Sequence, residues 1–223
     1  MPRLARGLGD NLLYHVINRG NGRQEVFHKD SDYEAFIHLM KQSKDRYSVK
    51  VFAYCLMPNH FHMVLMPGKG EDLSKYMQWL MTSHVRRYHS HYGSSGHVWQ
   101  GRFKSFLVQR DSYLLMVLRY VEANPVRAGL VLSAKEWLWS SHKARLGRAA
   151  YGAVQMIDEL PMDIPESWDT YVDTPLTEKD LEKLRQSIAR QSPFGNSDWQ
   201  VKVSREFGLE STLRPKGRPK REK

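Results

Sequence analysis

The chain has a single cysteine, Cys55, among its 223 residues, so it can form no internal disulfide. A disulfide-stapled secreted scaffold is therefore excluded, and a cytoplasmic protein is expected. No apolar run approaches the roughly 18 residues that a membrane-spanning helix needs, so no membrane partner is expected. The sequence also contains no P-loop motif and predicts no nucleotide cofactor.

Acidic residues are in the minority. Asp and Glu number 24 against 34 Lys and Arg, which gives a formal net charge of +10 and a pI of about 9.7. Such a surface attracts polyanions and speeds their capture. Nucleic acid is the first partner to consider and an anionic membrane surface the second, and basicity alone does not separate DNA from RNA. A DNA-binding role would make the protein nucleoid-associated.

Apolar residues recur with strand periodicity in four segments and with helical periodicity in three. Their order is strand, helix, strand, strand, helix, strand, helix. This order predicts an α+β domain with a split βαβ arrangement, in which an antiparallel sheet carries its helices on one face. The segments are 12–20, 30–47, 48–57, 60–66, 72–88, 102–110 and 111–124.

The character of the sequence changes after Gly147, which divides the chain into three parts. Residues 1–147 form the predicted sheet domain. Residues 148–213 form a loop-rich and helical extension, with a charged helix at 177–191. Residues 214–223 are too polar and basic to fold alone and are predicted to be a flexible tail.

The stretch "PNHFHMVL" at 58–65 places two histidines inside a strand-like run. Residues i and i+2 of a strand face the same side, so His60 and His62 present two imidazoles in parallel. Two neutral imidazoles make half of a typical metal site. The alternative is that both are polar residues on a solvated sheet face.

The helix predicted at 111–124 adds a tyrosine and an amide to this pattern. Tyr120 and Asn124 are four residues apart and share one helical face. Together with a histidine pair they would form a metal site with an adjacent nucleophile. The alternatives are a packed Tyr120 and a helix-capping Asn124. Tyr113, seven residues before Tyr120, is a rival nucleophile on nearly the same face.

Basic and aromatic side chains interleave in "SHVRRYHSHY" (83–92) and "HVWQGRFKSF" (97–106), a pattern that suits phosphates and unpaired bases. The alternatives are a solvated helix face for the arginines of the first stretch and a core position for the tryptophan of the second. Arg127 would reach a phosphate or cap the preceding helix. "RPKGRPKR" (214–221) is similar to an AT-hook, with a solvated tail as the alternative. The predicted DNA-binding residues are Arg86, Arg87, Trp99, Gln100, Arg102, Lys104, Arg127, Arg214, Lys216 and Arg218, with Arg102 and Lys104 foremost.

Three stretches, "PNHFHMVL", "VWQGRFKSFLVQ" and "LRYVEANPVRAGLV", together resemble the HUH single-tyrosine transposases of the IS200 type, in particular their domesticated branch, the REP-associated tyrosine transposases. The resemblance spans roughly residues 10–145 in the expected order. It implies a ferredoxin-like fold. It also implies cleavage and rejoining of single-stranded DNA near hairpins of repetitive extragenic palindromes (REPs).

The resemblance also implies roles for individual residues. His60 and His62 match the paired metal ligands, Tyr120 matches the nucleophile, and Asn124 stands where relatives supply a third polar ligand, often glutamine. The implied metal is Mg²⁺ or Mn²⁺. A monomer is favoured, with a dimer as the alternative.

The implied reaction is attack of Tyr120 on a DNA phosphate, giving a 5′-phosphotyrosine link and a free 3′-hydroxyl. A free tyrosine has a pKa near 10 and is a poor nucleophile at neutral pH, so a divalent cation would assist. Two other functions fit the same residues. A non-cleaving protein on this fold would bind and regulate hairpin DNA, and a nuclease that activates water would leave no protein–DNA adduct.

Overall fold

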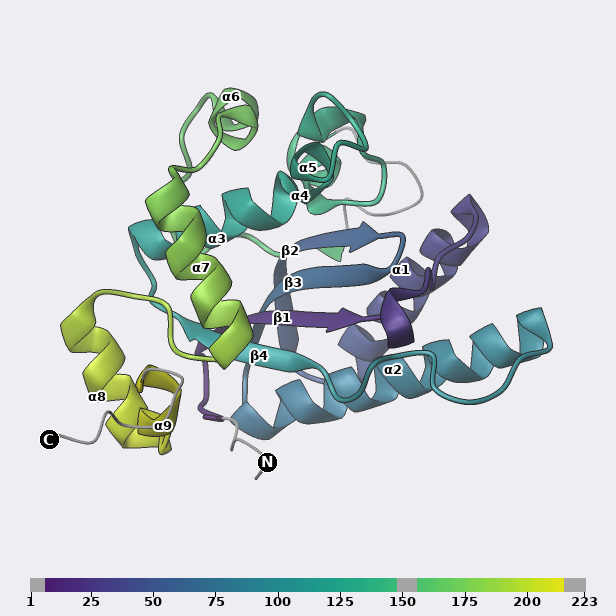
Figure 1. Cartoon of the computed structure of the whole chain (residues 1–223), viewed down its shortest axis with the longest axis horizontal. Helices are drawn as coiled ribbons and strands as arrows, with labels where there is room; N and C mark the ends of the chain where they lie inside the picture. Colours follow the sequence, from purple (N-terminus) through teal and green to yellow (C-terminus); the bar gives the residue numbers. More distant parts are fainter. Residues whose placement is uncertain (1–6, 148–155, 215–223) are drawn as a thin grey trace, which may run out of the picture.

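The computed structural model describes residues 7–147 and 156–214. Four strands form one antiparallel sheet in the order β2-β3-β1-β4, the order of a ferredoxin-like split βαβ fold (Figure 1). The predicted antiparallel α+β sheet is therefore confirmed. The strands are β1 (Leu13–Arg19), β2 (Val49–Met57), β3 (His60–Pro67) and β4 (Lys104–Val108).

The remaining elements of the described chain are helical. Those before residue 148 are η1 (Asn21–Arg23), α1 (Asp30–Arg46), α2 (Gly70–Tyr92), α3 (Ser112–Glu122), α4 (Asn124–Arg127), η2 (Ala134–Glu136) and α5 (Ser141–Arg145). Those after residue 155 are α6 (Trp168–Asp173), α7 (Glu178–Arg190), α8 (Ser197–Phe207) and α9 (Glu210–Leu213).

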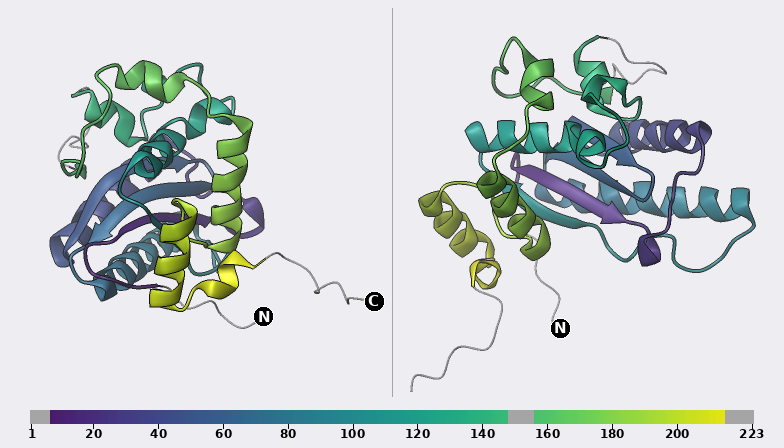
Figure 2. Two further views of the ribbon diagram at one scale, coloured as in Figure 1. Left: turned by 90° about the vertical axis from the view of Figure 1, so that its left-hand side faces the viewer. Right: turned by 45° about the horizontal axis from the view of Figure 1, so that its top comes forward.

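Helices lie on both faces of the sheet, which corrects the expectation of helices on one face. On the first face, α1 and α2 pack against Phe61 and Met63 of β3. On the second face, α3 packs against Val64 of β3 and Phe52 of β2. Figure 2 shows the two layers on either side of the strands. The reason lies in β2 and β3, which carry apolar side chains on both faces. Both sets are buried almost throughout, so each face needs a covering layer of helices.

The third helix is shorter than predicted. It ends at Glu122 instead of continuing to 124, and a separate short helix, α4, begins at Asn124. Pro125 explains the break, because proline has no N–H and disfavours a helical residue before it. Asn124 therefore lies at the start of α4, not in the last turn of α3.

Segments after β4 cover both edges of the sheet. At the β2 edge, the Val51 N–H donates to Asp158 Oδ2 at 2.7 Å, and the Leu56 N–H donates to the Trp139 carbonyl at 2.8 Å. At the β4 edge, the Phe194 N–H donates to the Leu107 carbonyl at 2.8 Å. The extension thus belongs to the same packed body as the sheet.

A buried carboxylate, Glu122, fastens the end of α3 to α5 and to α6. It accepts hydrogen bonds from Ser141 Oγ at 2.7 Å, His142 Nδ1 at 2.9 Å and Trp168 Nε1 at 2.7 Å, and pairs with Arg145 at 3.1 Å. Burial acts to raise the pKa of Glu122, but Arg145 and the hydrogen bonds outweigh it and lower that pKa to about 2. The carboxylate is therefore ionised and fully partnered, as a buried charge must be.

A second buried carboxylate, Asp32, joins the start of α1 to the end of α2. Its oxygens accept from Tyr92 Oη at 2.5 Å, the His28 N–H at 3.0 Å and Arg87 Nη1 at 3.2 Å. Burial acts to raise the pKa of Asp32, but the hydrogen bonds and the Arg87 charge hold it below the ordinary value. Arg87 thus has a structural partner inside the fold.

Among the described helices, none is long and apolar enough to cross a bilayer.

Replacing Asp32 by Asn should lower the free energy of unfolding at pH 7 by about 1–3 kcal/mol, because a buried charge-assisted hydrogen-bond set is lost. Since the folded pKa of Asp32 is depressed, its stabilisation is complete above the unfolded pKa of about 3.9 and is lost as pH falls through the folded value. The difference between wild type and D32N in urea denaturation should therefore shrink below about pH 4. The exposed Asp30→Asn is the matched control, and an equal effect of both would contradict the assignment.

Candidate functional site

The register of β1 against β3 sets the positions of the histidine pair. His60 lies opposite Arg19 and His62 opposite Ile17. Alternate residues of a strand share one face, so His60 and His62 lie on the same face as Val64, which packs against α3. Phe61 and Met63 lie on the other face and pack under α1 and α2. The prediction that the two imidazoles share one face of a strand is therefore confirmed. Their ring centroids are 5.1 Å apart.

Each imidazole is held at Nδ1 by a neighbour. His62 Nδ1 lies 2.9 Å from Nε2 of His15, and His60 Nδ1 lies 2.6 Å from Oδ1 of Asn59. This leaves Nε2 of each ring as the nitrogen for a ligand. A hydrogen bond on the opposite ring nitrogen is how metal-binding histidines are usually oriented.

The environment keeps these rings neutral at pH 7. Burial lowers the pKa of His60 to about 4, and the nearby Arg19 acts in the same direction. Burial and the neighbouring His15 and His60 hold the pKa of His62 well below its ordinary value. Burial also lowers the pKa of His15 to about 3. Neutral imidazole is the form that binds a metal ion.

Tyr120 comes from α3 to the same face of the sheet. Its ring meets the His62 ring edge-on, with centroids 5.6 Å apart. The Arg127 guanidinium carbon lies 3.8 Å from the centroid of the Tyr120 ring, and Arg127 Nη1 donates to the Tyr120 carbonyl at 2.8 Å. The Tyr120 side chain is nearly buried, and the described residues supply no hydrogen bond to its hydroxyl.

Asn124 completes this group at the start of α4. Its side chain lies near His60 and acts to raise the His60 pKa, against the larger lowering caused by burial. Asn124 Nδ2 is buried and has no partner. The two imidazoles and the Asn124 amide are thus neighbours on one face, and donors of these types fit a divalent cation that takes its remaining ligands from phosphate or water. In the described ranges, no group of three or more His, Cys, Asp or Glu side chains is arranged so that these side chains alone could hold a metal ion.

The predicted DNA-binding residues fall into different settings. Arg87 pairs with Asp32 at 3.2 Å, so its position is explained by packing. Trp99 is 5% exposed and packs edge-on against Phe61, which encloses it in the core. Exposed Arg86 borders a cavity of about 690 Å³ between α2 and residues 96–103.

The other predicted DNA-binding residues lie nearer the histidine pair or at the end of the described chain. Gln100, Arg102 and Lys104 line a second cavity beside β1. Arg127 stacks on Tyr120 and bonds to a carbonyl of α3, so it fills the capping role, one of its two predicted roles. Arg214 is exposed. The predicted contacts at Lys216 and Arg218 lie outside the described residues.

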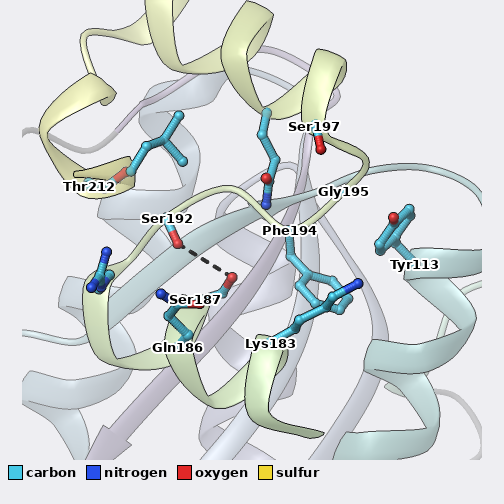
Figure 3. A pocket seen from close by; sticks show the side chains of 12 residues that line it. Tyr113, Lys183, Gln186, Ser187, Ser192, Phe194, Gly195, Ser197 and Thr212 are labelled. Atoms are coloured by element: carbon cyan, nitrogen blue, oxygen red, sulfur yellow. Dashed lines mark hydrogen bonds between the residues drawn. The ribbon is translucent and has the colours of Figure 1, made fainter. Parts of the chain in front are cut away.

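Tyr113, the rival nucleophile, lies elsewhere. Its ring meets the Phe194 ring edge-on at 5.2 Å. It lines a cavity of about 290 Å³ formed with α7, α8 and the loop between them (Figure 3). The histidine pair is not part of that cavity. Of the two candidate tyrosines, Tyr120 is therefore the one that lies beside the histidine pair.

Sequence reasoning missed three residues near the histidine pair. His15 and Arg19 come from β1, and Ile188 comes from α7, more than 120 residues after His62. For His15 and Arg19 a signal was present, because "YHVINR" puts both on one side of a strand. Nothing local indicates that Ile188 lies near this face.

Residues 9–124, about half of the chain, match the sequence model of the family described as IS200-like transposases. A curated relative from Haemophilus influenzae, provisionally named a REP-associated tyrosine transposase, is 29% identical over 123 residues, which cover 50% of this chain and 69% of that protein. The REP-associated tyrosine transposase of Escherichia coli K12 is 22% identical over 140 residues, which cover 62% of this chain and 80% of that protein.

A solved structure resembles the present one in fold. It is described as a REP-associated tyrosine transposase bound to a REP hairpin, and it superposes with a TM-score of 0.57 over 79% of this chain and 96% of that chain. The two chains are 16% identical, so the likeness is one of fold.

Replacing Arg127 by Leu should lower the free energy of unfolding by about 1–2 kcal/mol, because a cation–π contact and a charged hydrogen bond to the Tyr120 carbonyl are lost together. Arg127→Lys should recover only part of this, since an ammonium group cannot stack as a guanidinium does. The exposed Arg110→Leu is the control and should stay within about 0.5 kcal/mol of wild type. Equal urea denaturation curves for R127L and wild type would contradict the packing role.

Proposed function

Since the chain belongs to the IS200-like transposase family, we propose that it cleaves and rejoins single-stranded DNA beside REP-like hairpins, with Tyr120 as the nucleophile. One observation carries the proposal: the Tyr120 ring lies against His62, 5.6 Å between centroids, on the face that also holds His60 and Asn124. The names of the curated relatives and of the solved structure support the choice of REP hairpin DNA as the substrate.

A divalent cation, Mg²⁺ or Mn²⁺, would polarise the scissile phosphate when bound, with His60, His62 and Asn124 as its protein ligands. The neutral state of both imidazoles at pH 7 suits this task. Arg127, stacked on the Tyr120 ring, restricts where the phenol can lie. The Tyr120 residue is only 7% exposed, so its ring is held in place by packing.

The proposed step is a transesterification. Tyr120 Oη forms a bond to phosphorus while the bond from phosphorus to the 3′ oxygen breaks, which yields a 5′-phosphotyrosine and a free 3′-hydroxyl. The phenol loses one proton and the leaving 3′ oxygen gains one. Because the number of phosphoester bonds is unchanged, another 3′-hydroxyl can reverse the step and rejoin or exchange strands.

The DNA in this proposal is bound by basic and polar residues around the catalytic face, which is the sheet face that carries His60, His62 and Tyr120. Gln100, Arg102 and Lys104 line a cavity beside β1 and are the first candidates. Arg86 lies farther along the surface, and the tail from Arg214 onward would add electrostatic affinity for hairpin DNA. We further propose that one chain suffices, because α7 supplies residues to the same face from the same chain.

Replacing Tyr120 by Phe should abolish a covalent protein–DNA adduct, because the oxygen that bonds to phosphorus is removed. The assay incubates the full chain with Mn²⁺ and a REP-like hairpin carrying single-stranded flanks, and detects the adduct by denaturing electrophoresis. Tyr113→Phe is the matched control and should form the adduct as wild type does, because Tyr113 lies in a separate cavity.

Each outcome of that assay separates the candidate functions. An adduct that persists in Y120F would place the nucleophile elsewhere. Cleavage by wild type without any adduct would indicate a nuclease that activates water. Hairpin binding with neither cleavage nor adduct would indicate the non-cleaving regulatory function.

Replacing His60 by Ala should weaken Mn²⁺ binding at least about tenfold, because one of two imidazole ligands is lost. Electron paramagnetic resonance of free Mn²⁺ measures this without any DNA. Addition of EDTA should prevent the adduct, and Mn²⁺ should restore it. The control is His38→Ala, an exposed histidine on α1, and equal Mn²⁺ affinity in both variants would remove the metal from the proposal.

A further inference from the structure

A cavity of about 330 Å³ lies beside the histidine pair, at the end of β1. It is bounded by three segments that are far apart in the sequence, namely the end of β1, residues 100–104 and α7. The loop at 100–104 is fixed to β1, since the Asn18 side-chain amide donates to the Gly101 carbonyl at 2.9 Å and the Gln100 N–H donates to the Arg19 carbonyl at 2.9 Å. The walls are therefore preformed.

The cavity is cationic. Arg19, Arg102 and Lys104 line it, and no acidic residue is among the lining residues. Within the described ranges none of the three forms an ion pair. Arg19 Nε is buried and has no hydrogen-bond partner. An unpaired guanidinium nitrogen in a cationic cavity is costly unless an anion satisfies it.

Arg19 also connects the cavity to the histidine pair. It lies opposite His60 in the register of β1 and β3, and its charge acts on both His60 and His62. A group bound by Arg19 would thus be next to the place where the scissile phosphate is proposed to lie. Successive phosphates of one DNA strand are the anions that would occupy two such neighbouring places.

The remaining wall comes from α7, outside the residues that match the family. Leu181 and Leu184 anchor this helix in the core beneath α3. Arg185 and Ile188 follow on the same face of α7, one and two turns after Leu181. The charge of Arg185 acts on Arg127, and Ile188 borders the cavity. Figure 1 shows α7 crossing in front of β1 and β4. The extension thus contributes to the catalytic face of its own chain.

We propose that this cavity is a phosphate-binding subsite, closed by α7, for the DNA strand next to the scissile phosphate. The proposal rests on the proposed function and deepens it by assigning Arg19 as a strand-binding residue and Ile188 as the wall. Arg185 adds a further positive charge between this cavity and Tyr120, since it acts on Arg127, which stacks on the Tyr120 ring. Because the subsite is closed on one side by a helix, it takes an extended single strand in preference to a duplex.

The test measures binding of a fluorescein-labelled ten-nucleotide oligothymidylate to the full chain by anisotropy, in EDTA so that no metal contributes. Arg19→Gln should weaken binding about 10- to 100-fold, the range for one charged hydrogen-bonding group. It should also reduce the slope of log K against log salt by about 0.7, the value for one single-strand phosphate contact.

A pair of variants at Ile188 tests the part played by α7. Ile188→Gln and Ile188→Glu both lose the same packing, but only the glutamate brings a negative charge to the cationic cavity. I188E should bind at least about tenfold more weakly than I188Q, by like-charge repulsion of the phosphate. Lys179→Gln, exposed in the first turn of α7, removes one charge away from the cavity and should bind as wild type does.

Equal affinities for I188E and I188Q, or an R19Q variant no weaker than K179Q, would overturn the subsite. Selective loss of binding in R19Q and I188E supports it, whether or not an adduct with Tyr120 ever forms. An adduct that forms normally with unaltered binding in both variants would overturn the subsite alone and leave the proposed reaction standing.

Discussion

The burial of β3 on both faces is the constraint on which the rest of the molecule depends. Phe61 and Met63 are enclosed under α1 and α2, so His60 and His62 must point to the opposite face. A slip of one residue in register would exchange the two sets and put the imidazoles among the apolar side chains under α1 and α2. The apolar side chains thereby fix where the histidines stand.

The proposed catalytic face combines neutral imidazoles with fixed positive charge. Burial lowers the pKa of the three histidines His15, His60 and His62, while the guanidinium groups of Arg19 and Arg127 lie nearby. Protonated imidazoles would repel a metal ion, and nearby carboxylates would repel phosphate. The arrangement therefore suits the proposed metal-assisted phosphate chemistry, which requires a cation and a polyanion at the same place.

Local periodicity was enough to predict the four strands, the long helices and the common face of His60 and His62. It failed where distant segments decide the outcome. Arg87 looked like part of a DNA-binding face because its partner, Asp32, stands 55 residues earlier. Likewise, no pattern within α7 indicates that Ile188 borders the same face as His62, since only tertiary packing brings them together.

The covered edges of the sheet bear on how the chain is divided. Asp158 hydrogen-bonds to β2 and Phe194 to β4, and both lie beyond the part that matches the family. A fragment cut after residue 147 would leave amides and carbonyls of two outer strands without these partners, ready to pair with another molecule. The excised matching region would thus be prone to aggregate. In the full chain the extension caps the edge strands of the sheet and prevents such pairing.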